Sequence, residues 1–190
     1  MLEMKINNKK LGLIFIDLQN EYFQKGGILE VPDGIKVLER AMMILKTGRE
    51  LGIPVFHVRH ISRDPLDNTF KAGSEKVEFR QDVMPQKDEI VITKSRPGAF
   101  YLTGLDDRLR KKNIDTLALI GFLSFMCVDT TAREAHARGY DVLFIKDATA
   151  SINIGGIPAG RIHEVTCAIQ DWLFSKVIST EELISIMKEG

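Results

Sequence analysis

The chain has 190 residues, of which 44% are apolar and 27% are charged, and its 26 basic side chains balance its 26 acidic ones. This length suits one domain over residues 1–190 with a sizeable core, and the balanced charge gives no reason to expect a nucleic acid or a membrane surface as a partner. Two cysteines are too few for a disulfide framework, so a reducing, cytoplasmic location is expected.

Short apolar runs alternate with segments of helical periodicity along the chain. The apolar runs are continuous, which is typical of strands buried on both faces of a sheet. In chain order, we expect a strand at 11–17, a helix from 31–33 to Gly52, strands at 55–60 and 89–94, a helix at 105–112, a strand at 117–120, a helix at 128–139, a strand at 141–148, a helix at 159–175, a strand at 177–178 and a helix from Thr180.

This alternation predicts an α/β fold with a doubly wound, mainly parallel sheet of five to six strands and helices on both faces, a Rossmann-like three-layer sandwich. Such sheets bind ligands beyond the carboxyl ends of their strands, where the strand order reverses. The turn after the first strand lacks the G-x-G-x-x-G pattern, so a dinucleotide cofactor is not expected.

Two segments are irregular, and one helix carries a strong apolar stripe. Residues 61–88 form a long loop, which in a compact domain usually serves as a lid or a subunit contact, and residues 149–158 are expected to form a flexible loop. The helix at 159–175 places Cys167 opposite its stripe, in a structural or subunit-facing role. The residues of this predicted core stripe are Ile162, Val165, Ile169, Trp172 and Leu173.

Cys127 lies in the turn between the strand at 117–120 and the helix at 128–139. Unpaired N–H groups and the positive end of the helix dipole favour a thiolate at such a position. The alternative is a small buried hydrophobic residue, which is the usual role of a free cysteine. The position alone leaves both interpretations open.

Asp17 and Lys94 also follow the carboxyl ends of expected strands. Taken singly, Asp17 fits a helix cap or a turn, and Lys94 fits a solvated strand end. Because parallel strands end at one edge of a sheet, the fold would bring both residues beside Cys127. A thiol with a pKa of about 8.5 is mostly protonated at neutral pH, so a carboxylate that takes its proton and an ammonium that stabilises the thiolate would activate it. Backbone N–H groups of the turn at 121–127 would stabilise an oxyanion.

The strand at 55–60 ends with two histidines, His57 and His60. Histidines at this spacing sometimes hold a metal, but no third ligand is evident beyond Asp64. More often, one such histidine is packed and the other exposed. We therefore expect neither a metal nor another cofactor.

Five segments of the chain resemble the isochorismatase-like cysteine hydrolases, a family that includes nicotinamidase, N-carbamoylsarcosine amidohydrolase and ureidoacrylate amidohydrolase. They are FIDLQNEY, GSE at 73–75, ITKSRPGAF, GFLSFMCVDTTAREAHARGYDV and DATAS. The fourth segment is the most specific, since the family pattern there resembles G-x-x-T-x-x-C-V. This chain has Ser124 at the threonine position, which keeps the hydroxyl.

The resemblance implies a catalytic triad in which Asp17 is the base, Lys94 the electrostatic partner and Cys127 the nucleophile. It also implies a cis peptide between Phe122 and Leu123, which directs the N–H groups of Leu123 and Cys127 at the oxyanion. The implied reaction is the cleavage of a C–N bond in a small amide, ureido or carbamoyl compound through a thioester on the cysteine. The resemblance further implies a homo-oligomer of two or more subunits.

Two other functions are open: hydrolysis of a vinyl ether, as in isochorismatase itself, and non-catalytic binding of a small molecule on the same fold. Cys127 favours the C–N hydrolase, because the vinyl-ether enzymes need no cysteine. Nicotinamidase is disfavoured, because HISRDPLDN stands where its metal-binding run would be. A carboxylate on the substrate would suit Arg59, His60 and Arg96, although a solvated or ion-paired role fits each of the three at least as well. The full set of expected substrate contacts is Phe23, Arg59, His60, Arg96, Phe100 and Ser124.

Overall fold

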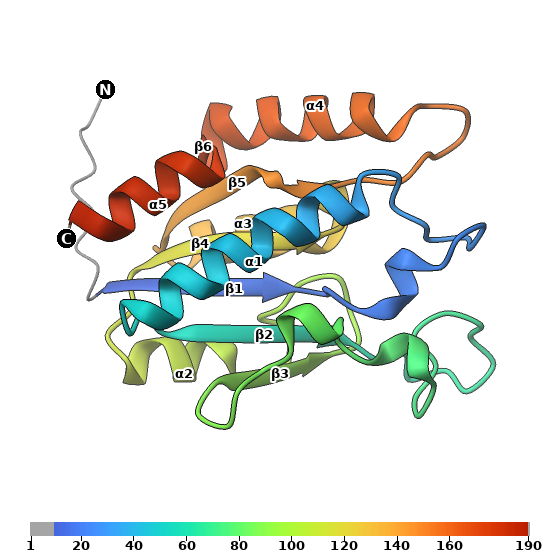
Figure 1. The fold of residues 1–190 in the computed structure, drawn as a ribbon, viewed down its shortest axis with the longest axis horizontal. Coiled ribbons are helices and arrows are strands. Elements are labelled where there is room, and N and C mark those ends of the chain that lie inside the picture. Colours follow the sequence, from blue (N-terminus) through green and yellow to red (C-terminus); the bar gives the residue numbers. More distant parts are fainter. Residues whose placement is uncertain (1–9, 190) are drawn as a thin grey trace.

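The computed structural model describes residues 10–189. The strands in this part of the chain form one parallel sheet of six strands in the order β3-β2-β1-β4-β5-β6 (Figure 1). The prediction of a doubly wound parallel sheet is confirmed. The strands are β1 (Leu11–Ile16), β2 (Val55–His60), β3 (Ile90–Lys94), β4 (Thr116–Phe122), β5 (Asp141–Ala150) and β6 (Lys176–Ile178).

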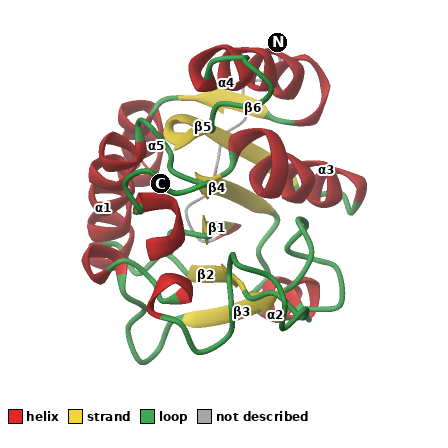
Figure 2. Ribbon diagram, turned by 90° about the vertical axis from the view of Figure 1, so that its right-hand side faces the viewer, coloured by secondary structure: helices red, strands yellow, loops and turns green. Residues whose placement is uncertain are grey.

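Helices cover both faces of the sheet (Figure 2). On one face lie α1 (Gly34–Glu50) and α5 (Thr180–Glu189), and on the other lie α2 (Leu105–Lys111) and α3 (Asp129–Ala137). The remaining α-helix of the described residues, α4 (Ala159–Ile169), lies near the β6 end of the sheet. Successive residues of β1 point to opposite faces, so this one strand supplies both hydrophobic cores.

The strand order reverses at β1, which pairs with β2 on one side and with β4 on the other. The carboxyl ends of all the strands point the same way, because every pairing in the sheet is parallel. In sheets of this kind the ligand crevice lies beyond the strand ends at such a reversal. The fold therefore places the expected site next to the residues that follow β1 and β4.

Gly121 lets β4 approach β1 closely just before the turn that carries Cys127. Its φ is +120°, and a Cβ at this position would lie 1.9 Å from the carbonyl oxygen of Ile16. We expect Gly121→Ala to lower the free energy of unfolding by about 3 kcal/mol, because the two strands must move apart. Urea unfolding measures this effect.

The matched control is Gly160→Ala in the first turn of α4. A Cβ there would have no atom within 4 Å, and the φ of Gly160 is not among the positive values. Alanine in a helix should raise the free energy of unfolding by up to about 1 kcal/mol. Equal responses of the two variants would contradict the close approach of β4 to β1.

The predicted core stripe of the helix expected at 159–175 is wrong, and this helix is divided into α4 and the π-helical turn Gln170–Phe174. Four members of this stripe are exposed, by 45% for Val165, 40% for Ile169, 83% for Trp172 and 55% for Leu173. The sheet is instead contacted by a small and polar face of this helix, which includes the buried Thr166, while Cys167 is half-buried and packs against the core on the α3 side. Periodicity correctly indicated an apolar face, but it does not reveal what covers that face.

Two irregular segments differ in part from expectation. The loop expected at 149–158 begins later, because Thr149 and Ala150 extend β5 and pair with β4 after a register shift. Residues 61–88 contain two short 3₁₀ turns, Glu75–Val77 and Gln81–Val83, and one isolated β-bridge from Phe79 to Gln19. Within residues 10–189 the longest helix has 17 residues, and none is long and apolar enough to cross a bilayer.

Candidate active site

Three predicted site residues meet at the carboxyl edge of the sheet. Asp17 directly follows β1, Lys94 is the last residue of β3, and Cys127 lies in the turn after β4. The Lys94 Nζ is 2.7 Å from Asp17 Oδ2 and 3.2 Å from Cys127 Sγ. None of the three residues is more than 3% exposed. The structure thus brings an acid, an amine and a sulfur into one buried cluster.

Local backbone geometry fixes the positions of the Asp17 carboxylate and the Cys127 sulfur. Asp17 has a φ of +53°, in the left-handed region that aspartate tolerates better than most residues, and this turns the chain sharply off β1. Cys127 lies in the π-helical turn Ser124–Val128, which continues directly into α3. The Thr131 hydroxyl donates a hydrogen bond to the carbonyl oxygen of Cys127 at 2.7 Å. The sulfur is therefore held in the first turn of a helix.

His60 is the third neighbour of the Lys94 ammonium. The distance from Lys94 Nζ to His60 Nδ1 is 3.2 Å. An ammonium has three N–H groups, and Asp17, Cys127 and His60 offer one acceptor atom each. Gln19 holds His60 in place, because its side-chain amide accepts a hydrogen bond from the His60 N–H and donates one to the His60 carbonyl oxygen.

Burial sets the protonation states of this cluster. Burial, reinforced by the charge of Lys94, lowers the pKa of His60 to about 4, so the imidazole is neutral at pH 7 and accepts a hydrogen bond from the ammonium. Burial and then the charge of Asp17 raise the pKa of Cys127 to about 12. The raised pKa keeps the resting sulfur a thiol, whereas the position of Cys127 in the sequence left a thiolate and a small buried hydrophobic residue both open.

Asp17, His60 and Cys127 form the one group in residues 10–189 whose ligand atoms, within 4.8 Å of one another, suit a metal ion. The Lys94 ammonium already lies against all three. Burial opposes its charge, but the Asp17 carboxylate and the hydrogen bonds to Asp17 and Cys127 outweigh burial and raise the pKa of Lys94, so a metal cation would be repelled. His57 does not belong to this group of possible ligands, because its Nε2 lies 2.9 Å from Glu89 Oε2 and its ring stacks on Phe15.

The other predicted substrate contacts lie in different environments. Phe100 is 6% exposed and lies beside Tyr140 in the hydrophobic core that also contains Cys127, and its role as a substrate contact stays a prediction. Arg59 donates a hydrogen bond to Thr93 Oγ1 on the neighbouring strand, and Arg96 is exposed. Nearer the cluster, Phe23 packs on Phe122, and the fully buried Ser124 hydroxyl has no hydrogen-bond partner among the described residues.

The backbone beside Cys127 also follows the expected pattern of the turn. The peptide bond between Phe122 and Leu123 is cis. The Leu123 carbonyl oxygen accepts hydrogen bonds from the N–H groups of Met126 and Val128, which closes the turn around the cysteine.

Tyr22 and Phe70 lie next to the cluster but were not predicted as site residues. Tyr22 is 2% exposed, and burial together with the charges of Cys127 and Asp17 raises its pKa well above the usual range. Its ring packs on Phe122 at 5.2 Å and on Phe70 at 5.4 Å. Tyr22 falls within the FIDLQNEY segment, which is the one signal that pointed to it, whereas nothing in the sequence around Phe70 did so.

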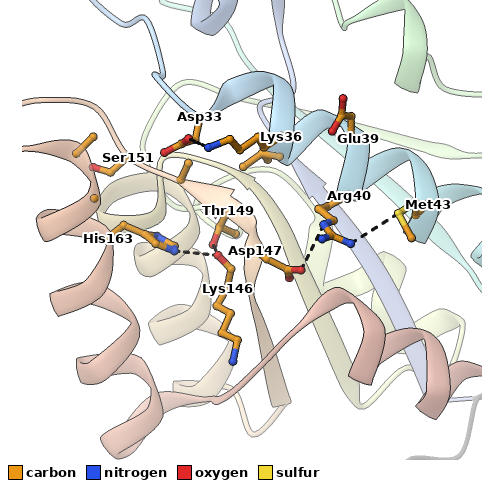
Figure 3. Close-up of a pocket in the computed structure, with 14 residues that line it drawn as sticks. Asp33, Lys36, Glu39, Arg40, Met43, Lys146, Asp147, Thr149, Ser151 and His163 are labelled. Carbon is orange, nitrogen blue, oxygen red and sulfur yellow. Dashed lines mark hydrogen bonds and ion pairs between the residues drawn. The ribbon is translucent and has the colours of Figure 1, made fainter.

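A cavity of about 500 Å³ lies elsewhere, between α1, the end of β5 and the start of α4 (Figure 3). No member of the cluster lines it. Two of its cations are paired, Lys36 with Asp33 at 2.8 Å and Arg40 with Asp147 at 3.6 Å. It therefore lies apart from the buried cluster of Asp17, Lys94 and Cys127.

Comparison with known proteins identifies the family. The model of the isochorismatase domain matches residues 12–182. The chain is also 33% identical over 177 residues to an uncharacterized isochorismatase family protein, YddQ of Bacillus subtilis, a match that covers 90% of this chain and 97% of that one. The chain belongs to the isochorismatase family. The family prediction is confirmed, and with it the prediction of a hydrolase.

Other relatives in the isochorismatase family have the names of amide hydrolases. Nicotinamidase 3 of Arabidopsis thaliana is 27% identical, with 93% of this chain and 88% of that protein covered. A ureidoacrylate amidohydrolase of Methylorubrum extorquens is also 27% identical, with 80% and 75% covered.

Solved structures of the isochorismatase family share the fold. A putative isochorismatase hydrolase from Oleispira antarctica has a TM-score of 0.86 at 27% identity, covering 95% of this chain and 98% of that one. N-carbamoylsarcosine amidase from Thermoplasma acidophilum has a TM-score of 0.78 at 26% identity, with 90% and 97% covered.

Proposed function

We propose that this chain is a cysteine hydrolase that cleaves a C–N bond in a small amide, ureido or carbamoyl compound. The observation that carries the proposal is the buried ammonium of Lys94, which lies against the Asp17 carboxylate and the Cys127 sulfur together. The names of the amide-hydrolysing relatives support it.

The first half of the reaction makes a thioester. Asp17 takes the proton of the Cys127 thiol, and Lys94 stabilises the thiolate as it forms. The thiolate attacks the carbonyl carbon, and the N–H groups of Leu123 and Cys127 bind the oxyanion. The C–N bond then breaks, the nitrogen leaves as ammonia or an amine with the proton from Asp17, and the acyl group stays on the sulfur.

The second half releases the acid. Asp17, again unprotonated, takes a proton from a water molecule, which attacks the thioester carbonyl. The C–S bond breaks, the proton returns to the sulfur, and the carboxylic acid leaves. The sum is one amide and one water converted to one acid and one amine, and no step needs a metal.

Ammonia release from a panel of carbamoyl, ureido and carboxamide compounds tests the assignment, with Cys127→Ser as the blank. We expect at least one compound to release ammonia about 10³-fold faster with the wild-type chain than with the blank. Release from none of them would count against the C–N hydrolase. If Cys127→Ala keeps full activity on a vinyl ether, the isochorismatase-type alternative holds instead.

We also propose that the chain forms a homo-oligomer through the exposed apolar face of α4 and of the π-helical turn Gln170–Phe174 that follows it, with a second copy as the partner. The resemblance to the family implies oligomers, and Val165, Ile169, Trp172 and Leu173 supply an apolar patch of the kind that interfaces bury. We expect Trp172→Asp to lower the molar mass in solution, as measured by analytical ultracentrifugation. Leu66→Asp is the control, because Leu66 is 85% exposed outside this face. An unchanged mass for Trp172→Asp would rule out this interface.

A further inference from the structure

Phe70 is the next layer outward from the buried cluster. Its ring lies 4.8 Å from the ring of His60 and 5.4 Å from that of Tyr22, centre to centre. His60 contacts Lys94 directly, and Tyr22 packs on Phe122, the last residue of β4 before the turn that carries Cys127. Phe70 therefore brings the irregular segment at 61–88 onto two residues that lie next to the cluster.

Phe70 anchors the first part of this segment. It is 8% exposed, and it is the one buried residue in the stretch 61–76, where all the others are exposed or partly exposed. Phe70 is therefore the one deeply inserted side chain of this stretch, whose far end is held by the hydrogen bond from Asn20 to the Glu75 carbonyl oxygen and by the Lys76–Glu21 pair. A loop attached in this way can open locally at a small cost in free energy.

A buried carboxylate holds the backbone of Phe70 in an unfavourable conformation. The φ of Phe70 is +52°, which is rare for a bulky aromatic residue. Its N–H donates a hydrogen bond to Glu21 Oε2 at 3.0 Å, and Glu21 is only 5% exposed. The nearest cation is Lys76, with Nζ 3.7 Å from Glu21 Oε1. Burial of a carboxylate costs free energy, and here the Glu21 carboxylate stabilises a strained backbone conformation beside the cluster.

The nucleophile needs an opening, since Cys127, Asp17 and Lys94 are almost fully enclosed. We propose that Phe70 is the outer wall of the acyl-binding site and sets the size of the substrates admitted, and that Glu21 is a positioning residue that holds Phe70 closed. The substrate part of this proposal rests on the proposed hydrolase function. The control of access to the Cys127 sulfur does not, because any thiol reagent must use the same opening.

Alkylation of Cys127 at pH 9 with a small and a bulky reagent, iodoacetamide and N-phenylmaleimide, tests the proposal. The label is read on the Cys127 peptide by mass spectrometry, which separates it from Cys167. The ratio of the alkylation rate with the bulky reagent to that with the small reagent reports access to the Cys127 sulfur. A change in the thiolate fraction of Cys127 affects both rates equally and cancels in this ratio. For Phe70→Gly and Glu21→Ala we expect this ratio to rise about 10-fold or more, because the opening no longer closes.

Three variants serve as controls. Glu21→Gln keeps an acceptor for the Phe70 N–H, and Phe70→Leu keeps the bulk, so both should stay within about 3-fold of the wild-type ratio. Glu30→Ala removes a carboxylate from the same region that accepts from Gly26 N–H on the exposed surface, and it should leave the ratio unchanged. Glycine adopts a φ of +52° freely, so Phe70→Gly is expected to fold.

A ratio that stays at the wild-type value in both Phe70→Gly and Glu21→Ala overturns the proposal. A rise of the ratio in Glu30→Ala as large as in Glu21→Ala also overturns the proposal, because the loss of any carboxylate in this region would then loosen the loop. Once an amide substrate is known, Phe70→Gly should raise kcat/KM for branched acyl groups relative to unbranched ones. If no variant hydrolyses any amide, the proposed hydrolase function fails. The alkylation ratio still decides whether Phe70 and Glu21 control access to the Cys127 sulfur.

Discussion

Replacement of Asp17 by asparagine is expected to change the two reactions of Cys127 in opposite directions. Hydrolysis should fall by about 10³-fold, because no base takes the thiol proton or activates water. Alkylation at pH 8 should become faster, because the charge of Asp17 raises the pKa of Cys127 while Lys94 lowers it. Without Asp17 the pKa of the thiol falls, and each unit gives about tenfold more thiolate at that pH. The pH dependence of iodoacetamide labelling measures the shift.

Asparagine suits this test because it tolerates the left-handed backbone of Asp17 as well as aspartate does. Asp82→Asn is the control, since Asp82 is a surface carboxylate paired with Arg80. Slower alkylation together with lost hydrolysis would mean that Asp17 does not raise the thiol pKa. Retained hydrolysis would remove Asp17 from the mechanism.

The second large effect is expected at Lys94. Lys94→Met should lower kcat/KM by about 10³-fold and should slow alkylation of Cys127, because the one cation that stabilises the thiolate is lost. It should also cost about 3–5 kcal/mol of unfolding free energy, since the buried Asp17 carboxylate loses its partner, with both side chains 0% exposed. Urea unfolding and alkylation kinetics measure the two effects separately.

A double variant separates stability from chemistry in this pair. Asp17→Asn with Lys94→Met removes both buried charges, so it should be less destabilised than the sum of the single variants. It should remain inactive, because neither the base nor the cation is restored. Additive losses of stability would contradict a direct pairing of the two residues.

The cluster was accessible to prediction from the sequence because of where its residues stand in the chain. Asp17, Lys94 and Cys127 each follow an apolar run, and parallel strands bring their ends to one edge. His60 was a candidate for binding a substrate carboxylate or for a solvated or ion-paired role, and in the structure it is neutral and faces Lys94. Its protonation state depends on burial, which local sequence does not show.

The wall of the site could not be predicted, because long-range hydrogen bonds set the path of residues 61–88. Gln19 donates to the carbonyl oxygen of Val77, and Asn20 donates to that of Glu75. These bonds join residues more than 50 positions apart and fold the segment over the turn after β1. The position of Phe70 follows from this path and leaves no periodic pattern.

The misassigned face of α4 has a similar cause. Its apolar residues repeat with helical spacing, but the contacts with the sheet are made by smaller side chains such as Ala159 and Thr166. The periodic pattern was correct, but the element that packs against this helix is not encoded in the local sequence.

Trapping of the acyl-enzyme tests the central claim most directly. During turnover of an amide found in the ammonia screen, acid quenching followed by peptide mass spectrometry should find the acyl group on the Cys127 peptide, removable by hydroxylamine as expected for a thioester. Turnover without any acyl group on Cys127, together with full activity of Cys127→Ala, would contradict the account.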